Sequence, residues 1–119
     1  MEKILLPVLI CLATILGRAA EPYHFLKEIP VGGDSGWDYA SVDSAAQRLY
    51  VSHGNKVVVI DLAKDAAFGE ITNTPGVHGV ALAPGLDLGV TSNGRENKAG
   101  IVSLKTLQTL VKVDTAEGP

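Results

Sequence analysis

Cysteine is absent from residues 21–119, because the one cysteine of the chain, Cys11, lies in its first 20 residues. Aromatic side chains are scarce as well, with one tryptophan, three tyrosines and two phenylalanines among 119 residues. Without cysteine, residues 21–119 cannot be a small domain held together by disulfides, and they cannot attach haem through a CxxCH motif. Their stability must come from the packing of aliphatic side chains.

Positive charge is also sparse in residues 21–119, which hold 8 basic and 12 acidic side chains, a net charge of −4. The basic residues form no stripe, so nucleic-acid binding through phosphate neutralisation is not expected. The longest apolar run, Ile4–Leu16, has 13 residues, fewer than the ~20 that a membrane-spanning helix needs. Residues 21–119 are therefore expected to interact neither with nucleic acid nor with a membrane.

The apolar run Ile4–Leu16 is typical of a secretory signal peptide, which we place at residues 1–20. Lys3 precedes the run and the small residues of Gly17-Arg18-Ala19-Ala20 follow it, so cleavage is expected after Ala19 or Ala20. Export of a chain that lacks disulfides indicates a bacterial envelope protein, either periplasmic or secreted.

The rest of the sequence contains nearly the same unit twice. Residues 37–71 align with residues 77–113 at an offset of 40, which becomes 42 after a two-residue insertion in the second copy. A repeat near 40 residues, built from short β-branched runs and turn residues, is typical of a four-stranded β-propeller blade. The sequence therefore predicts an all-β fold with blades at 37–71 and 77–113, within a partial propeller domain over residues 21–119.

Strands in the first copy are expected at residues 39–42, 48–52, 57–61 and 68–71, with a tight turn at His53–Asn55. The second copy repeats this pattern with a longer turn at Asn93–Lys98. Upstream, Leu26–Ile29 resembles the last strand of each copy and predicts a lone terminal strand. Its partners would be the first three strands of a further blade, which the printed sequence does not contain.

A closed propeller uses about four to eight blades, so two blades cannot close one. Three explanations for a chain with two blades are open. The chain is a piece of a longer reading frame, or several copies assemble into a ring, or the repeat forms a small β-sandwich. Thr115–Pro119 resembles the lead-in to another blade, as Thr74–Gly76 leads into Val77, and favours the first explanation. A chain of this length alone is expected to self-associate through unpaired sheet edges.

Four stretches carry a resemblance to a known family: RLYVSHG at Arg48–Gly54, VVVIDL at Val57–Leu62, GVHGVALAP at Gly76–Pro84 and TSNGREN at Thr91–Asn97. On these residues the chain resembles the YncE-like, YVTN-repeat β-propellers over essentially all of residues 21–119. The resemblance implies an exported wheel of about seven blades, in a family whose members mostly have no assigned activity.

In propeller geometry, the loops before the first strand and between the second and third strands of each blade converge on one rim of the channel. Loops that converge in this way are the usual place for a ligand. The candidate ligand-binding residues at this rim are Trp37, Asp38, His53, His78, Asn93 and Arg95.

Metal binding by Asp38, His53 and His78 is chemically possible, since imidazole and carboxylate groups bind divalent ions. These three residues come from different loops and form no metal-binding motif, so we expect no metal and no cofactor. Ser52 and Ser92 recur at one position of each copy, which indicates a structural role, and no GxSxG motif is present. No catalytic residue is therefore nominated.

The prediction for function is an exported binding scaffold for a small ligand or an envelope protein. The alternative is part of a propeller enzyme, lactonase-like, otherwise hydrolytic, or redox, whose catalytic residues lie in other blades.

Overall fold

The computed structural model describes residues 22–119, and the predicted signal peptide at residues 1–20 lies outside them. The strands are β1 (Trp37–Asp43), β2 (Arg48–His53), β3 (Lys56–Asp61), β4 (Ala66–Ile71), β5 (Val77–Ala83), β6 (Leu88–Asn93), β7 (Lys98–Ser103) and β8 (Thr109–Asp114), and two 3-10 turns are η1 (Pro84–Leu86) and η2 (Gly94–Glu96). No helix within residues 22–119 has the length and apolar character needed to cross a membrane.

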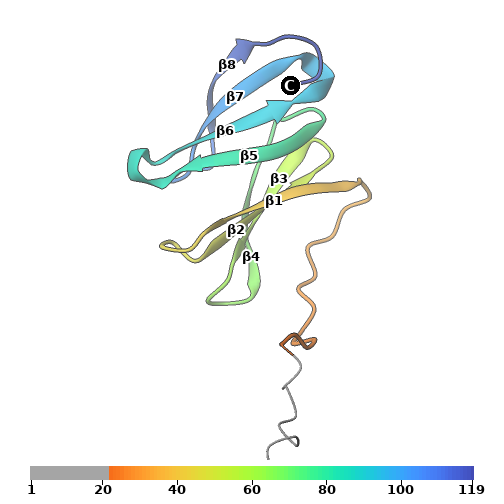
Figure 1. Cartoon of the computed structure of the whole chain (residues 1–119), viewed down its shortest axis with the longest axis vertical. Helices are drawn as coiled ribbons and strands as arrows, with labels where there is room; N and C mark the ends of the chain where they lie inside the picture. Colours follow the sequence, from red (N-terminus) through yellow and green to blue (C-terminus); the bar gives the residue numbers. More distant parts are fainter. Residues whose placement is uncertain (1–21) are drawn as a thin grey trace, which may run out of the picture.

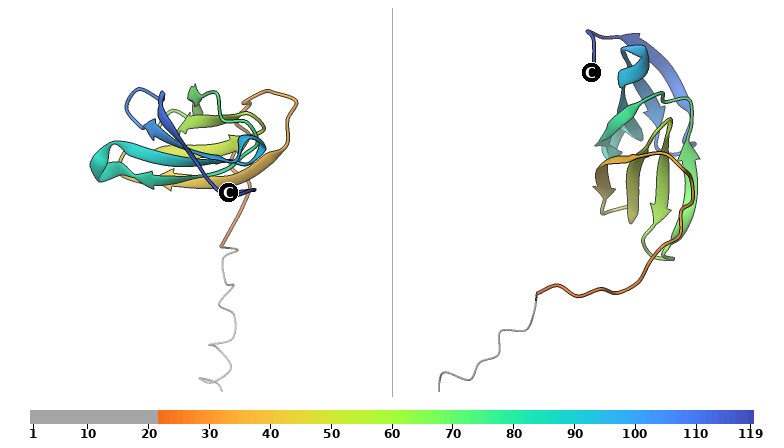
Figure 2. Two further views of the ribbon diagram at one scale, coloured as in Figure 1. Left: turned by 90° about the horizontal axis from the view of Figure 1, so that it is seen from above. Right: turned by 90° about the vertical axis from the view of Figure 1, so that its right-hand side faces the viewer.

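The eight strands form two antiparallel sheets of four, in the orders β1-β2-β3-β4 and β5-β6-β7-β8. We call them blade 1 and blade 2; they stack with β5 beside β1 (Figures 1 and 2). Both blades are irregular at equivalent places, between Trp37 and Ala40 in blade 1 and between Val77 and Val80 in blade 2. The all-β prediction and the division into two repeated four-stranded units are confirmed.

Aspartate side chains close the turns at the ends of two strands in blade 1. The Asp43 carboxylate accepts hydrogen bonds from the N–H groups of Ala45 and Ala46 at 3.1 and 3.0 Å, and Asp61 accepts from Ala63 and Lys64 at 2.9 and 3.0 Å. Burial acts to raise the pKa of Asp61, but these N–H groups and the Lys64 ammonium together hold it below its ordinary value. In blade 1 these turns are therefore fixed by the side chain of the last residue of the strand before each of them.

The hydrophobic core lies between the two blades. Tyr50, Val57, Val59 and Ile71 of blade 1 form one buried cluster with Val77, Val80, Val102, Leu104 and Leu107 of blade 2. Polar contacts join the same surfaces, because the Ser41 hydroxyl donates to the carbonyl of Val80 at 2.6 Å and Arg48 donates to the carbonyl of Leu104 at 3.1 Å. Each blade therefore depends on its neighbour to bury its apolar face.

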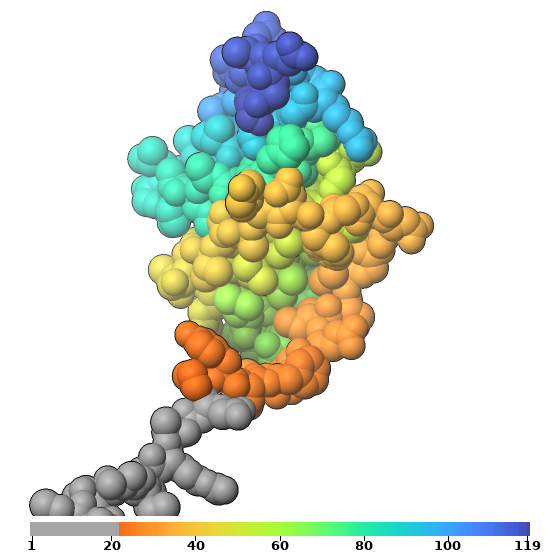
Figure 3. Space-filling model, turned by 45° about the vertical axis from the view of Figure 1, so that its right-hand side comes forward, coloured from red at the N-terminus to blue at the C-terminus, as the bar shows by residue number. Residues whose placement is uncertain are grey.

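Residues 22–36 run along blade 1 before entering β1 (Figure 3). An ion pair between Lys27 and Asp65 holds this segment to the β3–β4 turn. Residues 26–29, expected as a lone strand, form no ladder with another strand of the described chain. The strands expected to pair with them are not part of the sequence, so the lone strand stays a prediction.

Candidate functional site

The predicted rim contains a cavity of about 320 Å³. It lies where the segments before β1 and β5 meet the β2–β3 and β6–β7 turns, as expected from the repeat. Four of the six candidate residues line it, and two, His53 and Asn93, do not. The lining residues are Gly36, Trp37, Asp38, Gly54, Gly76, Val77, His78, Gly94, Arg95 and Gly118.

Asp38 and His78 contact each other across the rim, with Nδ1 of His78 2.8 Å from Oδ2 of Asp38. The two residues occupy the same position in successive copies of the repeat. Their side chains are half-exposed, so the pair contributes little to stability. It instead presents a carboxylate and an imidazole side by side to anything that enters the cavity.

Trp37 stacks on His53, with ring centroids 3.8 Å apart and an angle of 13° between the ring planes. His53 is buried, and its Nδ1–H donates to the carbonyl of Gly36 at 3.2 Å. The imidazole covers one face of the indole, but Trp37 as a whole is 51% exposed. His53 therefore supports the aromatic residue of the rim and is not itself accessible to a ligand.

Arg95 is positioned by Asn55, whose side-chain oxygen accepts a hydrogen bond from Nη1 of Arg95 at 3.2 Å. Asn55 was not among the predicted residues, although it aligns with Arg95 at the 40-residue offset. Gly76 lies directly beneath Arg95 with a φ of +64°, and a Cβ at this position would lie 2.5 Å from Cγ of Arg95. Only glycine allows the backbone to adopt this conformation so close to the arginine.

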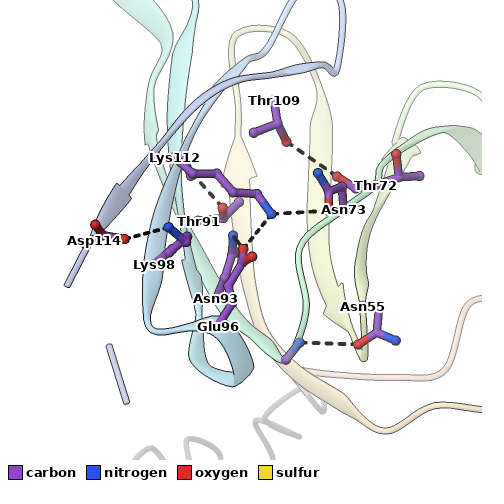
Figure 4. Close-up of polar contacts among 12 residues, drawn as sticks. Asn55, Thr72, Asn73, Thr91, Asn93, Glu96, Lys98, Thr109, Lys112 and Asp114 are labelled. Atoms are coloured by element: carbon purple, nitrogen blue, oxygen red, sulfur yellow. Dashed lines mark hydrogen bonds and ion pairs between the residues drawn. The ribbon is translucent and has the colours of Figure 1, made fainter. Parts of the chain in front are cut away.

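Asn93 belongs to a polar network that fixes the turn carrying Arg95 (Figure 4). The buried Asn93 amide donates to Glu96 at 2.8 Å, and the Lys112 ammonium contacts Glu96 at 2.6 Å and Asn73 at 3.2 Å. The hydrogen bond from Lys112 is the main reason that the pKa of Glu96 lies below its ordinary value. The network ties η2 to β8 and to the β4–β5 connection. Because Arg95 precedes Glu96 in η2, the network also fixes the backbone that carries Arg95.

The metal hypothesis gains no support from this geometry. Among residues 22–119, no three histidine, cysteine, aspartate or glutamate side chains lie close enough to hold an ion together. His53 faces Trp37, whereas His78 faces Asp38. The described rim combines an aromatic surface with charged and hydrogen-bonding groups, which is suited to binding a small polar molecule.

No family model and no curated protein matches the sequence. Solved structures do match: hydrazine synthase from Kuenenia stuttgartiensis has a TM-score of 0.68 at 15% identity, over 81% of this chain and 28% of that one. Two structures of AztD from Citrobacter koseri, one of them apo, have TM-scores of 0.64 and 0.63 at 15% identity, over 76% of this chain and 26% of theirs.

These matching structures are β-propellers, so the likeness shows a propeller-like fold for this chain. The chain spans between a quarter and a third of the length of the matching chains.

Proposed function

We propose that the chain is two adjacent blades of an exported, YncE-like β-propeller that serves as a binding scaffold in the bacterial envelope. The rim cavity would bind a small ligand or a loop of an envelope protein. The observation that carries this proposal is the convergence of Trp37, Asp38, His78 and Arg95 around one cavity. These side chains come from the start of β1, the start of β5 and the η2 turn, which are far apart in the sequence and meet at the rim.

The geometry after β8 supports the proposal that the parent protein has further blades. After β4, the N–H of Thr74 donates to the carbonyl of Asn55 at 3.2 Å; after β8, the N–H of Thr115 donates to the carbonyl of Asn97 at 2.9 Å. The side chains of the same asparagines accept from Gly76 at 3.4 Å and from Gly118 at 3.2 Å. The segment after blade 2 thus repeats the connection that leads from blade 1 into β5.

The ligand class follows from the groups at the rim. The exposed part of the Trp37 indole can stack on a sugar ring or a nucleobase. Asp38 and His78 can exchange hydrogen bonds with hydroxyl or amine groups, and Arg95 can donate to an acceptor. A small ring compound with several hydroxyl or carbonyl groups fits this combination best.

The test titrates sugars and nucleosides into the full-length parent protein and measures binding by calorimetry. Asp38→Asn or Arg95→Met should weaken binding about tenfold or more, since hydrogen bonds to charged groups contribute about 1.5–3 kcal/mol. Leu86→Ser, in an exposed turn away from the rim, should bind as the wild type does. Equal affinity in all variants would place the ligand elsewhere.

A further inference from the structure

A second cavity, of about 210 Å³, lies between the two blades where β2 begins, whereas the rim lies where β2 ends. We call it the junction cavity. The charged and hydroxyl-bearing side chains that line it are Asp43, Arg48 and Tyr50 of blade 1 and Asp87 and Lys105 of blade 2. Both walls belong to the two blades of this chain, so the cavity is formed without any further blade.

Arg48 is held in one position at the junction cavity. Its Nη1 donates to the carbonyl of Leu104 at 3.1 Å, and its guanidinium carbon lies 3.8 Å from the ring centroid of Phe68. A guanidinium has five N–H donors, so most of them remain after the contact with Leu104. Among the described residues, no carboxylate forms an ion pair with this half-buried cation. The cavity therefore contains a positioned positive charge that is open to an anionic group.

The other charged groups of the junction cavity are also unpaired within residues 22–119. Lys105 is the only lysine of this part of the chain that forms no ion pair. Asp43 and Asp87 form none there either, although Oδ1 of Asp43 accepts the two N–H groups of its turn. Two positive and two negative side chains thus line one small cavity without pairing with each other.

The repeat does not require these charges, because the other blade lacks them. In the aligned copies, Asp43, Arg48, Asp87 and Lys105 correspond to Ala83, Leu88, Gln47 and Ala63. A charge that both blades needed for their own folding would recur at the same position of each copy. The four charges therefore belong to this one junction, and folding of a blade does not explain them.

Tyr50 is a second, independent indication of a ligand. It is 1% exposed, and its hydroxyl has no hydrogen-bond partner among residues 22–119. Buried polar groups are nearly always hydrogen-bonded, because an unpaired one costs free energy. Since Tyr50 lines the junction cavity, a molecule bound there is the natural source of the missing partner.

We propose that the junction cavity binds a free α-amino acid. Arg48, Lys105 and the Tyr50 hydroxyl donate to its carboxylate, and Asp87 accepts from its ammonium group. Asp43 adds a second negative charge, which disfavours a purely anionic ligand such as phosphate. The cavity is smaller than the ~300–1,000 Å³ of pockets for drug-sized ligands, which suits a ligand of few atoms. This proposal depends neither on the ligand at the rim nor on further blades.

The first test titrates the purified protein by calorimetry with L-alanine, which carries both charged groups and only a methyl side chain. Propionate lacks the ammonium group and ethylamine lacks the carboxylate, so they are matched controls. L-alanine should bind about tenfold more tightly than either one, because each control loses one set of charge-assisted hydrogen bonds. No binding of L-alanine at millimolar concentration, or equal binding of either control, would overturn the proposal.

A pair of lysine variants tests whether the ligand lies in this cavity. Lys105→Met removes a charge that has no ion-pair partner within residues 22–119 and should weaken binding of L-alanine about tenfold. Lys64→Met removes the same charge from the β3–β4 turn, where the side chain is 77% exposed, and should bind as the wild type does. Unchanged affinity in Lys105→Met, or an equal loss in both variants, would overturn the proposal.

Tyr50→Phe separates the binding of the ligand from the folding of the chain. The substitution removes only a hydroxyl that has no partner among residues 22–119, so urea unfolding without L-alanine should show no loss of stability. The affinity for L-alanine should nevertheless fall several-fold, because the carboxylate loses a hydrogen bond. An affinity equal to that of the wild type would overturn the proposed position of the carboxylate.

Discussion

Replacing Val59 with alanine should destabilise the protein through the contact between the blades. Val59 is fully buried in β3, in the core between the two blades. The substitution removes two methyl groups, a loss of about 1.6 kcal/mol at ~0.8 kcal/mol per buried carbon. A residual cavity of a few tens of Å³ adds up to about 1 kcal/mol at ~24 cal/mol per Å³. We therefore expect a total loss of about 2.5 kcal/mol in the free energy of unfolding.

The assay is urea unfolding followed by circular dichroism, with Leu86→Ala as the control. A loss of about 2.5 kcal/mol should lower the urea midpoint by about 0.8–2.5 M, because m-values of small domains are about 1–3 kcal/mol per M. Leu86 is 72% exposed in η1, so its substitution should change stability by less than about 0.5 kcal/mol. If the blades did not pack together, Val59 would lie on an open face. A loss below ~1 kcal/mol would therefore refute the reasoning.

Three further substitutions test other contacts by the same urea assay. Gly76→Ala should cost about 1–3 kcal/mol, since it forces a side chain into a left-handed conformation against Arg95; unchanged stability would contradict this turn geometry. The lowered pKa of Glu96 stabilises the fold above pH 4.5, and that stability is lost as pH falls through the lowered value. Lys112→Met should therefore reduce the loss of stability between pH 7 and pH 3, and an unaltered pH profile would count against the ion pair. Tyr50→Phe should leave stability equal or slightly higher, because the buried Tyr50 hydroxyl has no hydrogen-bond partner among residues 22–119; a loss above ~1 kcal/mol would reveal a missing partner.

The repeat made most of the fold predictable. The third strand of the first copy, expected at 57–61, is found at Lys56–Asp61, and the first strand extends to Trp37 and Asp43 beyond the expected 39–42. Copies that share hydrophobic positions must share strand register, because a slip by one residue would turn every apolar side chain to the wrong face. The ends of strands depend on single hydrogen bonds and so were less certain.

Turn conformations were harder to predict from residue type. Gly54 has the expected positive φ of 64°, but Gln47 and Asp87 also have positive φ values of 52° and 54°. These two residues are equivalent in the repeat, so the blade backbone imposes the conformation despite their side chains. Asp65 and Leu107 form a second equivalent pair with positive φ, at 52° and 60°. Leucine rarely adopts a positive φ, so the sequence did not indicate this conformation at Leu107, whose side chain is buried in the core between the blades.

The sequence predicted where the rim lies, but not which of its side chains are buried or which of them contact each other. The repeat placed Asp38 and His78 at the same position of adjacent blades, and they do meet. The same offset of 40 residues relates Asn55 to the predicted residue Arg95, and these two side chains also meet, but Asn55 itself was not predicted. The burial of His53 and Asn93 could not be read from the sequence, since turn residues of polar type are usually exposed.

Formation of a disulfide between β1 and β5 tests most directly whether the two repeats are adjacent blades. A Cβ built on Gly79 would lie 3.6 Å from Cβ of Tyr39, within the range of Cβ–Cβ distances in disulfides, about 3.5–4.5 Å. The double variant Tyr39→Cys and Gly79→Cys, made in residues 21–119 where no other cysteine occurs, should form an intramolecular disulfide on mild oxidation. Tyr39→Cys with Gly85→Cys, in the η1 turn, should not. Peptide mapping that finds no bridge between positions 39 and 79 in the monomer, or that finds bridging equally in both variants, would contradict the packing of blade 1 against blade 2.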